Sequence, residues 1–312
     1  MLPHALDQSL IGHQKYFNLL KILYAQQTLH PCWILYGQKG IGKSTFSYHF
    51  AEYILSKNPL NPTGLSKGVV HHQIKINSYP NLLILAQSNI FQEDSQEIPF
   101  LEAKRLQRFL NQSPAIPGWR VIIVDAIDEM NRFAINSLLK IFEEPPLKTL
   151  FLLICHNFSK VPATLRSRCQ KLNFLPLQPE DVDLLMRSSF DKDLFHASQG
   201  SIGRYQNVLK SGGNSFLNLL KETINFASQG QWVQVYKFCQ DTARIPEQFE
   251  TFIWLKPQLI YDKIMSLQGP QQKRWLEISR KINFLLKAKD NYVDKFQLIT
   301  ACFLAIENPY LN

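Results

Sequence analysis

The sequence has no apolar run that approaches the ~18 uncharged residues of a membrane-spanning helix. It begins MLPHALDQSLIGHQ, with Asp and His ahead of any apolar run, which is unlike a signal peptide. Its 5 cysteines are odd in number, widely spaced and without a CxxC pair. Such scattered thiols suit neither a disulfide framework nor a zinc site. We therefore expect a cytoplasmic protein with reduced thiols, no zinc and no membrane association.

Charged residues are few, at 19% of the chain, and apolar residues reach 45%, a mixture typical of a folded protein. Lys and Arg number 34 against 25 Asp and Glu, a net charge of +9. This excess favours a polyanionic partner such as nucleic acid without identifying it. The 312 residues exceed one typical domain and indicate two or three. No internal repeat or low-complexity tract is present.

Short apolar runs rich in β-branched and aromatic residues recur through the first half, each followed by polar or helix-like sequence. They predict strands at residues 32–36, 82–85, 121–124 and 150–155, with a weaker one at 171–175. Strands that alternate with helices indicate a parallel sheet covered on both faces, the α/β class.

The remaining segments predict a loop and a helical C-terminal part. Residues 56–78 contain two prolines and two glycines, which favours a loop or insertion on the surface. Amphipathic patterns predict helices at residues 216–226, 232–238 and 275–286.

The octapeptide GQKGIGKS at residues 37–44 matches the phosphate-binding pattern GxxxxGK[ST], between a predicted strand and a predicted helix. Its glycines let backbone N–H groups turn toward a phosphate chain, Lys43 would reach the β- and γ-phosphates, and Ser44 would ligate magnesium. The nucleotide-binding residues predicted here are Gly37, Gly40, Gly42, Lys43, Ser44 and Thr45. We therefore expect ATP and magnesium as ligands.

A second acidic element supports this prediction. The strand-like run VIIVD ends at Asp125, where a carboxylate would lie beside magnesium. An active ATPase of the AAA+ type would carry Glu at the next position, but this chain has Ala126. Asp128 and Glu129 lie past the strand end, where we expect them to cap the following helix. The sequence thus predicts nucleotide binding and argues against hydrolysis.

Two further segments carry a family resemblance. Residues 131–146, NRFAINSLLKIFEEPP, closely resemble the clamp-loader signature NxLLKxLEEPP. Five apolar side chains are expected to form one broad face of this helix: Phe133, Leu138, Leu139, Ile141 and Phe142. Residues 165–170, LRSRCQ, contain the SRC motif of clamp-loader subunits. The chain is therefore identified as a member of the bacterial DNA polymerase III clamp-loader family of AAA+ proteins.

The resemblance implies roles for single residues. Arg168 of the SRC motif corresponds to an arginine finger that enters the ATP site of a neighbouring subunit. Lys140 corresponds to a lysine that touches the DNA backbone in the central channel. Arg204, within GSIGR at residues 200–204, corresponds to the second sensor arginine, which contacts a nucleotide bound in cis. The first sensor is expected near residues 155–157, with Cys155, His156 and Asn157 all left open.

Within the family, the chain resembles the delta-prime type of subunit more than the motor type. Motor subunits keep the catalytic acid and a four-cysteine zinc module, whereas this chain has Ala126 and no cysteine between Cys32 and Cys155. Its intact phosphate loop departs from delta-prime members that have lost the loop. Two alternatives remain: a gamma/tau-type motor ATPase, and a non-catalytic P-loop regulator.

The resemblance also implies an architecture and partners. We expect a RecA-like P-loop domain at residues 1–176, a helical lid at 177–211 and a helical collar at 212–312 that assembles the subunits. The expected partners are gamma/tau motor subunits and a delta subunit in a hetero-pentamer, the sliding clamp and primer-template DNA. The reaction served would be ATP-driven loading of the clamp during replication.

Overall fold

The computed structural model describes residues 10–57, 67–86, 100–287 and 294–307. The chain divides into two compact units, Met1–Leu185 and Met186–Asn312. The three-domain division at residues 176 and 211 remains a prediction. None of the helices in the described ranges is long and apolar enough to cross a membrane.

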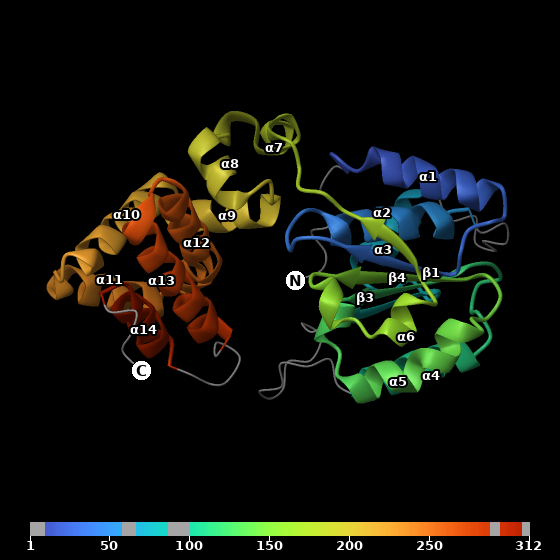
Figure 1. Ribbon diagram of the computed structural model, residues 1–312. Coiled ribbons are helices and arrows are strands. Elements are labelled where there is room, and N and C mark those ends of the chain that lie inside the picture. Colours follow the sequence, from blue (N-terminus) through green and yellow to red (C-terminus); the bar gives the residue numbers. More distant parts are fainter. Residues whose placement is uncertain (1–9, 58–66, 87–99, 288–293, 308–312) are drawn as a thin grey trace. The chain divides into compact units, whose positions relative to one another are not determined.

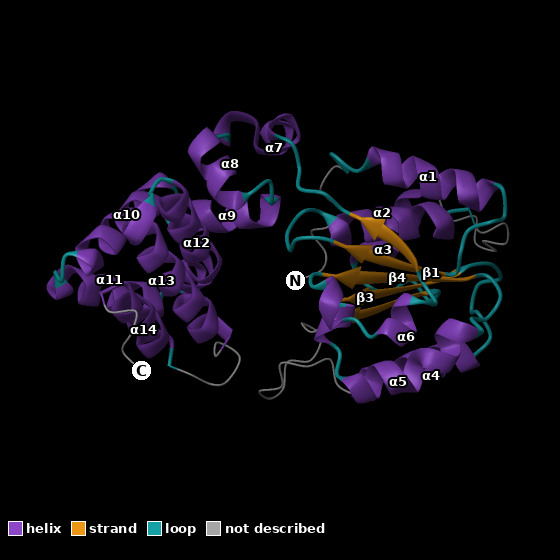
Figure 2. Ribbon diagram, in the orientation of Figure 1, coloured by secondary structure: helices purple, strands orange, loops and turns teal. Residues whose placement is uncertain are grey.

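The first unit is built on a five-stranded parallel sheet, as the sequence predicts (Figure 2). Its strands are β1 (Cys32–Tyr36), β2 (Leu82–Ala86), β3 (Arg120–Asp125), β4 (Thr149–Cys155) and β5 (Gln170–Asn173). They lie in the order β2-β3-β4-β1-β5. The strand β1 is therefore an interior strand, with β4 and β5 on its two sides. In such a sheet the loops that follow central strands meet at one edge, where ligands bind.

Helices cover both faces of the sheet (Figure 1). The helices of this unit are α1 (Gln14–Ala25), α2 (Lys43–Leu55), α3 (Lys67–Lys75), α4 (Phe100–Asn111), α5 (Arg132–Glu143), α6 (Ala163–Arg166) and α7 (Pro179–Met186). Alternate side chains of β1 enter opposite cores: Leu35 packs with residues of α1, α2 and α3, and Ile34 packs with residues of α4, α5 and α6. Burial of strands on both faces explains their continuous apolar runs.

The prediction of a loop throughout residues 56–78 is wrong in part, because α3 lies within this range. Val70 and Ile74, one helical turn apart, are buried in the core beside α2. The glycines and prolines of this range favour a loop. The four-residue spacing of the two β-branched residues, in contrast, fits one face of a helix. Residues 58–66 of this stretch lie outside the described ranges.

The described residues of the second unit form helices joined by short loops, with no strand among them. Its α-helices are α8 (Lys192–Ser198), α9 (Ile202–Lys210), α10 (Asn214–Ser228), α11 (Trp232–Arg244), α12 (Pro246–Met265), α13 (Gly269–Lys287) and α14 (Lys295–Glu307). Aromatic rings from four helices meet inside it, with Phe238 packed against Phe216, Phe252 and Phe303. The helices predicted from amphipathic patterns are confirmed as α10, α11 and α13.

Candidate functional site

The phosphate loop connects β1 to α2 in the first unit. Gly37, Gly40 and Gly42 adopt positive φ angles of 151°, 83° and 97°, a region that L-residues with side chains rarely enter. A Cβ atom at Gly37 would lie 2.3 Å from the carbonyl oxygen of Phe174. All three of these sequence-predicted glycines thus have a backbone reason, and Gly37 also has a steric one.

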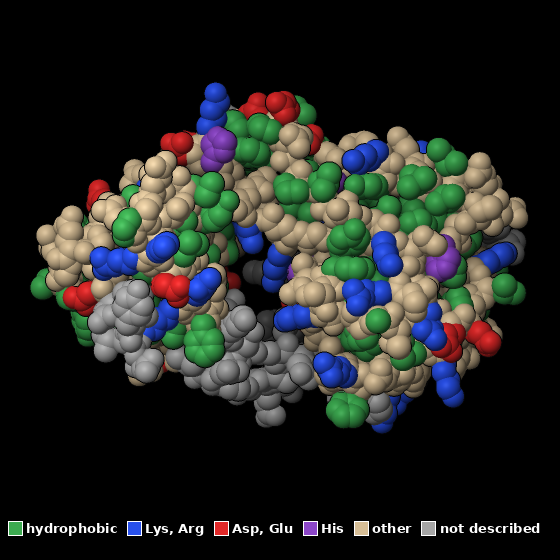
Figure 3. Space-filling view, viewed as in Figure 1, with side chains coloured by type: hydrophobic (Ala, Val, Ile, Leu, Met, Phe, Trp, Pro, Cys, Tyr) green, Lys and Arg blue, Asp and Glu red, His purple; other side chains and the backbone are tan. Residues whose placement is uncertain are grey.

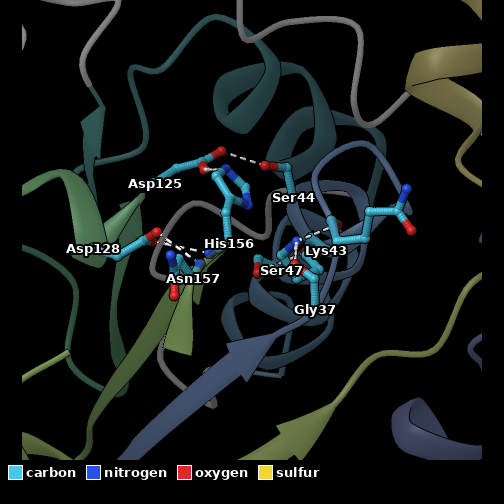
Figure 4. A network of polar contacts seen from close by, with 9 residues as sticks. Gly37, Lys43, Ser44, Ser47, Asp125, Asp128, His156 and Asn157 are labelled. Carbon is cyan, nitrogen blue, oxygen red and sulfur yellow. Dashed lines mark hydrogen bonds and ion pairs between the residues drawn. The ribbon is translucent and has the colours of Figure 1, made fainter. Parts of the chain in front are cut away.

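Lys43 folds back onto the loop that precedes it. Its Nζ donates to the carbonyl oxygens of Gly37 and Gln38 at 2.6 and 2.7 Å (Figure 4). The side chain is buried, and burial lowers the pKa of Lys43 to about 8. Loop carbonyls hold the ammonium group at the loop, where a phosphate chain could take their place.

Ser44 and Asp125 meet across the edge of the sheet. The Ser44 hydroxyl, in the first turn of α2, donates to the carboxylate of Asp125 at the end of β3 (Figure 4). Burial raises the pKa of Asp125, while the Ser44 hydrogen bond and the charge of Lys43 lower it. Thr45 follows in α2 and is half-buried. The fold therefore brings together the lysine, hydroxyl and carboxylate that the sequence predicts around a nucleotide and its metal ion.

His156, directly after β4, lies beside this group. Its Nε2 is 4.0 Å from an oxygen of Asp125, and Figure 4 shows the ring next to that carboxylate. Burial, followed by the charge of Lys43, lowers the pKa of His156 to about 4, so the ring is neutral at physiological pH. Of the three positions left open for the first sensor, this geometry favours His156. Asn157 instead accepts bonds from the backbone and hydroxyl of Ser159 at 3.2 and 2.6 Å.

Two buried polar atoms near the loop have no hydrogen-bond partner among the described residues: Gln38 Nε2 and His156 Nδ1. An unpaired buried polar atom is costly, and a bound ligand is one way to satisfy it. Together with Lys43 and the turned loop glycines, these atoms fit a phosphate chain. No group of three or more His, Cys, Asp or Glu residues in the described ranges is placed to hold a metal ion by itself.

The acidic pair after Asp125 does not cap the next helix, so that expectation is wrong. Asp128 belongs to a 3-10 helix, η3 (Ile127–Glu129), and its carboxylate accepts from the backbone N–H groups of His156 and Asn157 at 2.9 and 2.8 Å. The cap of α5 is Asn131, which accepts from the N–H of Ala134 at 2.8 Å. Asn is among the best N-cap residues, so this signal was present in the sequence. These two hydrogen bonds to Asp128 fix the backbone of the loop that carries His156.

The expectation that five apolar side chains form one face of α5 is wrong for one of them. Leu138 and Phe142 are buried beneath the helix and Leu139 and Ile141 are partly buried, but Phe133 is 81% exposed and does not join the apolar face. Lys140 is exposed, as a DNA-contacting lysine must be. The helix ends at Glu143, before the two prolines.

Arg168 lies just before β5, where its guanidinium pairs with the carboxylate of Glu143 at the end of α5. It also donates to the carbonyl oxygen of Thr164 at 2.6 Å. The side chain is 32% exposed. The two family motifs are thus joined by an ion pair, which the sequence did not predict because 25 residues separate its partners.

Arg204 belongs to the second unit, in the first turn of α9. Its guanidinium lies 5.1 Å from the ring centroid of Trp254 and donates to Gln199 Oε1 at 3.1 Å. Stacking on indole is a favourable arrangement for arginine. The sequence-predicted set is therefore divided, with Lys43, Ser44 and Asp125 assembled in the first unit and Arg204 held by its own neighbours in the second.

Comparison with known proteins identifies similar sequences. Residues 12–178 match the family model described as DNA polymerase III, delta subunit. The delta' subunit of Pseudomonas aeruginosa is 29% identical over 161 residues, which cover 51% of this chain and 48% of that protein. The tau subunit of Bacillus subtilis is 22% identical over 226 residues, 70% of this chain and 38% of that one. The chain thus spans half or less of these curated relatives.

A solved structure extends the likeness of fold over nearly the whole chain. The DNA polymerase III gamma subunit-related protein of Thermotoga maritima superposes with a TM-score of 0.51 at 13% identity, over 92% of this chain and 98% of that one. At this identity the likeness concerns the fold alone. The family model, by contrast, covers more than half of the sequence. The chain therefore belongs to the DNA polymerase III clamp-loader family of AAA+ proteins.

Proposed function

We propose that this chain is the delta-prime-type subunit of a DNA polymerase III clamp loader. In this role it supports ATP-driven loading of the sliding clamp onto primed DNA, beside gamma/tau-type motor subunits and a delta subunit in a hetero-pentamer. One observation carries the proposal. The residues that would hold a nucleotide are assembled, yet Ala126 occupies the position after Asp125 where a hydrolytic subunit would need its carboxylate.

The nucleotide proposed at this site is ATP with magnesium. Lys43 would exchange the loop carbonyls for the β- and γ-phosphates, and the loop N–H groups would cradle the chain. Ser44 and Asp125 would hold magnesium, which would neutralise phosphate charge. Arg204 would contact the same nucleotide in cis. We place the RecA-like domain at residues 1–176, the lid at 177–211 and the collar at 212–312.

Hydrolysis by this chain is expected to be negligible. Asp128 is already committed to two backbone N–H groups, so it is a poor substitute for the missing carboxylate. Glu129 is the alternative acid. Burial has the largest effect on its pKa and raises it, while the charge of Lys39 lowers it in part. If the chain were a motor subunit, Glu129 would be its candidate for activating water.

The test is an ATPase assay on the chain alone and within the reconstituted loader, with and without primed DNA. We expect tight nucleotide binding that Lys43→Ala abolishes, and turnover no higher than that of the Lys43→Ala control. Turnover that rises with DNA and disappears in both Lys43→Ala and Glu129→Gln would identify a motor subunit instead. Failure to assemble with motor and delta subunits would favour a P-loop regulator that works outside the loader.

Arg168 is the residue proposed to act on a neighbour. Glu143 holds its guanidinium at the protein surface in the isolated chain. On assembly, Arg168 would leave this carboxylate for the γ-phosphate bound by the adjacent motor subunit, because a phosphate carries more charge and also accepts a bidentate pair of hydrogen bonds. Lys140 is proposed to contact the DNA backbone, and the protein is proposed to work in the cytoplasm.

A further inference from the structure

One exposed stripe of α5 combines an aromatic ring with polar groups. Phe133, Asn136 and Lys140 are all exposed and lie three and four residues apart, which places them on one side of the helix. We call these three residues the α5 outer stripe. The opposite side of the helix carries Ala134, Ile135, Leu138 and Phe142, all buried in the core. The stripe therefore points away from the sheet.

Phe133 is unusual among the exposed apolar residues of the first unit. The other large ones in its described ranges are aliphatic, and Phe133 is the aromatic one, at 81% exposure. Lone exposed apolar residues are common on protein surfaces and need no explanation by themselves. The surroundings of this ring are what distinguish it.

Basic side chains flank the stripe on the neighbouring helix. The helices α4 and α5 lie side by side (Figure 1), and Gln107 of α4 donates to the carbonyl oxygen of Ser137 at 3.2 Å. With 100° per residue, Lys104 and Arg108 then lie on the outward side of α4 next to the stripe, and both are exposed. The nearby carboxylate of Glu143 is paired with Arg168. Lys and Arg side chains are also spread over the face of this unit displayed in Figure 3.

We propose that the α5 outer stripe is a binding surface for single-stranded DNA, in which the Phe133 ring stacks on an unpaired template base. An exposed ring amid cations is the arrangement that binds single strands without sequence preference, because every base has a π face. Seven residues of helix separate Phe133 from Lys140 by about 10 Å, or about three nucleotides at the ~3.4 Å rise of one DNA strand. Lys140 would then hold a backbone phosphate about three nucleotides from the stacked base.

This inference rests on the proposed clamp-loader role, and its test separates the two. The full chain is reconstituted with motor and delta subunits, and binding is measured with ATP on a primer-template that carries a fluorescent base analogue in its single-stranded template. We expect Phe133→Ala to weaken binding about fivefold or more and to remove the stacking-induced quenching of the analogue. Phe133→Trp should restore both, whereas Phe133→Leu should not. Binding to a blunt duplex should not change.

The matched control is Leu147→Ala, which truncates another exposed apolar residue of the same unit, 94% exposed and outside α5. It should behave as the wild-type chain. If Phe133→Ala leaves affinity and quenching unchanged while Lys140→Ala weakens binding, the stacking surface is wrong and the clamp-loader role stands. If Phe133→Leu restores function, or Phe133→Ala prevents assembly, the ring contacts another subunit rather than DNA. If no variant of the stripe affects DNA and the complex does not load clamps, both proposals fail.

Discussion

Burial sets the protonation of the phosphate-loop lysine and gives nucleotide binding a pH dependence. In the free chain the pKa of Lys43 is about 8, whereas bound phosphates would hold it charged. Above pH 8, binding must therefore take up a proton, and ATP affinity should fall by up to about tenfold per pH unit. Titration calorimetry between pH 7 and 9.5 measures both the affinity and the proton uptake.

The control for this prediction is Lys43→Arg, whose guanidinium remains protonated throughout the range. Its affinity is expected to be lower, because the loop fits an ammonium group, but independent of pH. A wild-type affinity that stays constant to pH 9.5 would mean that the free lysine keeps its charge despite burial.

A second buried lysine, Lys256 of α12, is fully enclosed in the helical unit. Its Nζ has no hydrogen-bond partner among the described residues, and it lies 4.2 Å from the ring centroid of Phe303. Burial lowers the pKa of Lys256 to about 8 from an ordinary value of 10.5. The cost of burying the charge is thus present below pH 8 and is relieved as the pH rises toward 10.5.

Replacing this lysine by an apolar residue of similar length should stabilise the chain. A pKa shift of this size corresponds to about 3 kcal/mol, partly offset by attraction to the rings, so Lys256→Met should raise the free energy of unfolding by about 1–3 kcal/mol at pH 7. Denaturant unfolding measures it, and the gain should shrink at pH 10. Destabilisation by Lys256→Met would show that the charge has a partner.

At the scale of elements, the helix α5 is the one for which an effect on DNA binding can be predicted most clearly. Lys140 is exposed on the helix that carries the family signature, and a phosphate contact contributes affinity without sequence preference. Lys140→Ala should weaken DNA binding of the assembled loader equally for all sequences and reduce the salt slope by about one unit. Equilibrium binding at several salt concentrations measures this slope, and an unchanged slope would make Lys140 an ordinary solvated residue.

Strands β1 to β4 were predictable because a strand buried on both faces must be apolar along its length. The edge strand β5 buries only Leu172, which explains why its signal in the sequence was weaker. The helix α3 was not predicted, since it buries only two β-branched residues inside a stretch of turn-forming ones. Phe133 was misplaced for a related reason. Periodicity identifies an apolar residue near a helix face, but whether a neighbouring element covers it depends on packing.

The same contrast applies to the candidate site. Lys43, Ser44 and Asp125 could be assigned from the sequence, because a strand, a loop and a helix in order fix their geometry. The sequence narrowed the first sensor only to three neighbouring residues. The geometry favours His156 among them because of the orientation of the loop after β4. The contacts of Arg168 and Arg204 join distant segments, which no local pattern reveals.

At the scale of the whole molecule, the proposed machinery is distributed. The phosphate loop lies in the first unit and Arg204 in the second, so the nucleotide contacts predicted from the sequence come from both units. Arg168 would extend these contacts to the next subunit. An ATP site of the loader would then contain residues of two chains. A chain that does not hydrolyse ATP could in this way still control hydrolysis by its neighbour.

Arg168 decides between such an active subunit and an inert spacer. Arginine fingers contribute ~10³–10⁵ in rate, or about 4–7 kcal/mol, but the effect on total turnover should be smaller here because the other motor sites keep their own fingers. Arg168→Ala should leave the chain folded, since its half-exposed pair with Glu143 contributes at most about 1 kcal/mol. It should leave the loader assembled while lowering ATP turnover and clamp loading, measured on the reconstituted complex.

Two variants make this test specific. Arg168→Lys should rescue little, because an ammonium group lacks the planar fork that binds phosphate. Arg166→Ala, two residues away, removes a guanidinium that lies 5.3 Å from the ring centroid of Phe158 and should affect turnover less. Glu143→Gln should free Arg168 from its intramolecular partner and leave loading intact or faster, because the carboxylate competes with the γ-phosphate for the same guanidinium. If Arg168→Ala assembles and loads clamps at the wild-type rate, the finger does not act in trans, and the subunit serves the ring only by its shape.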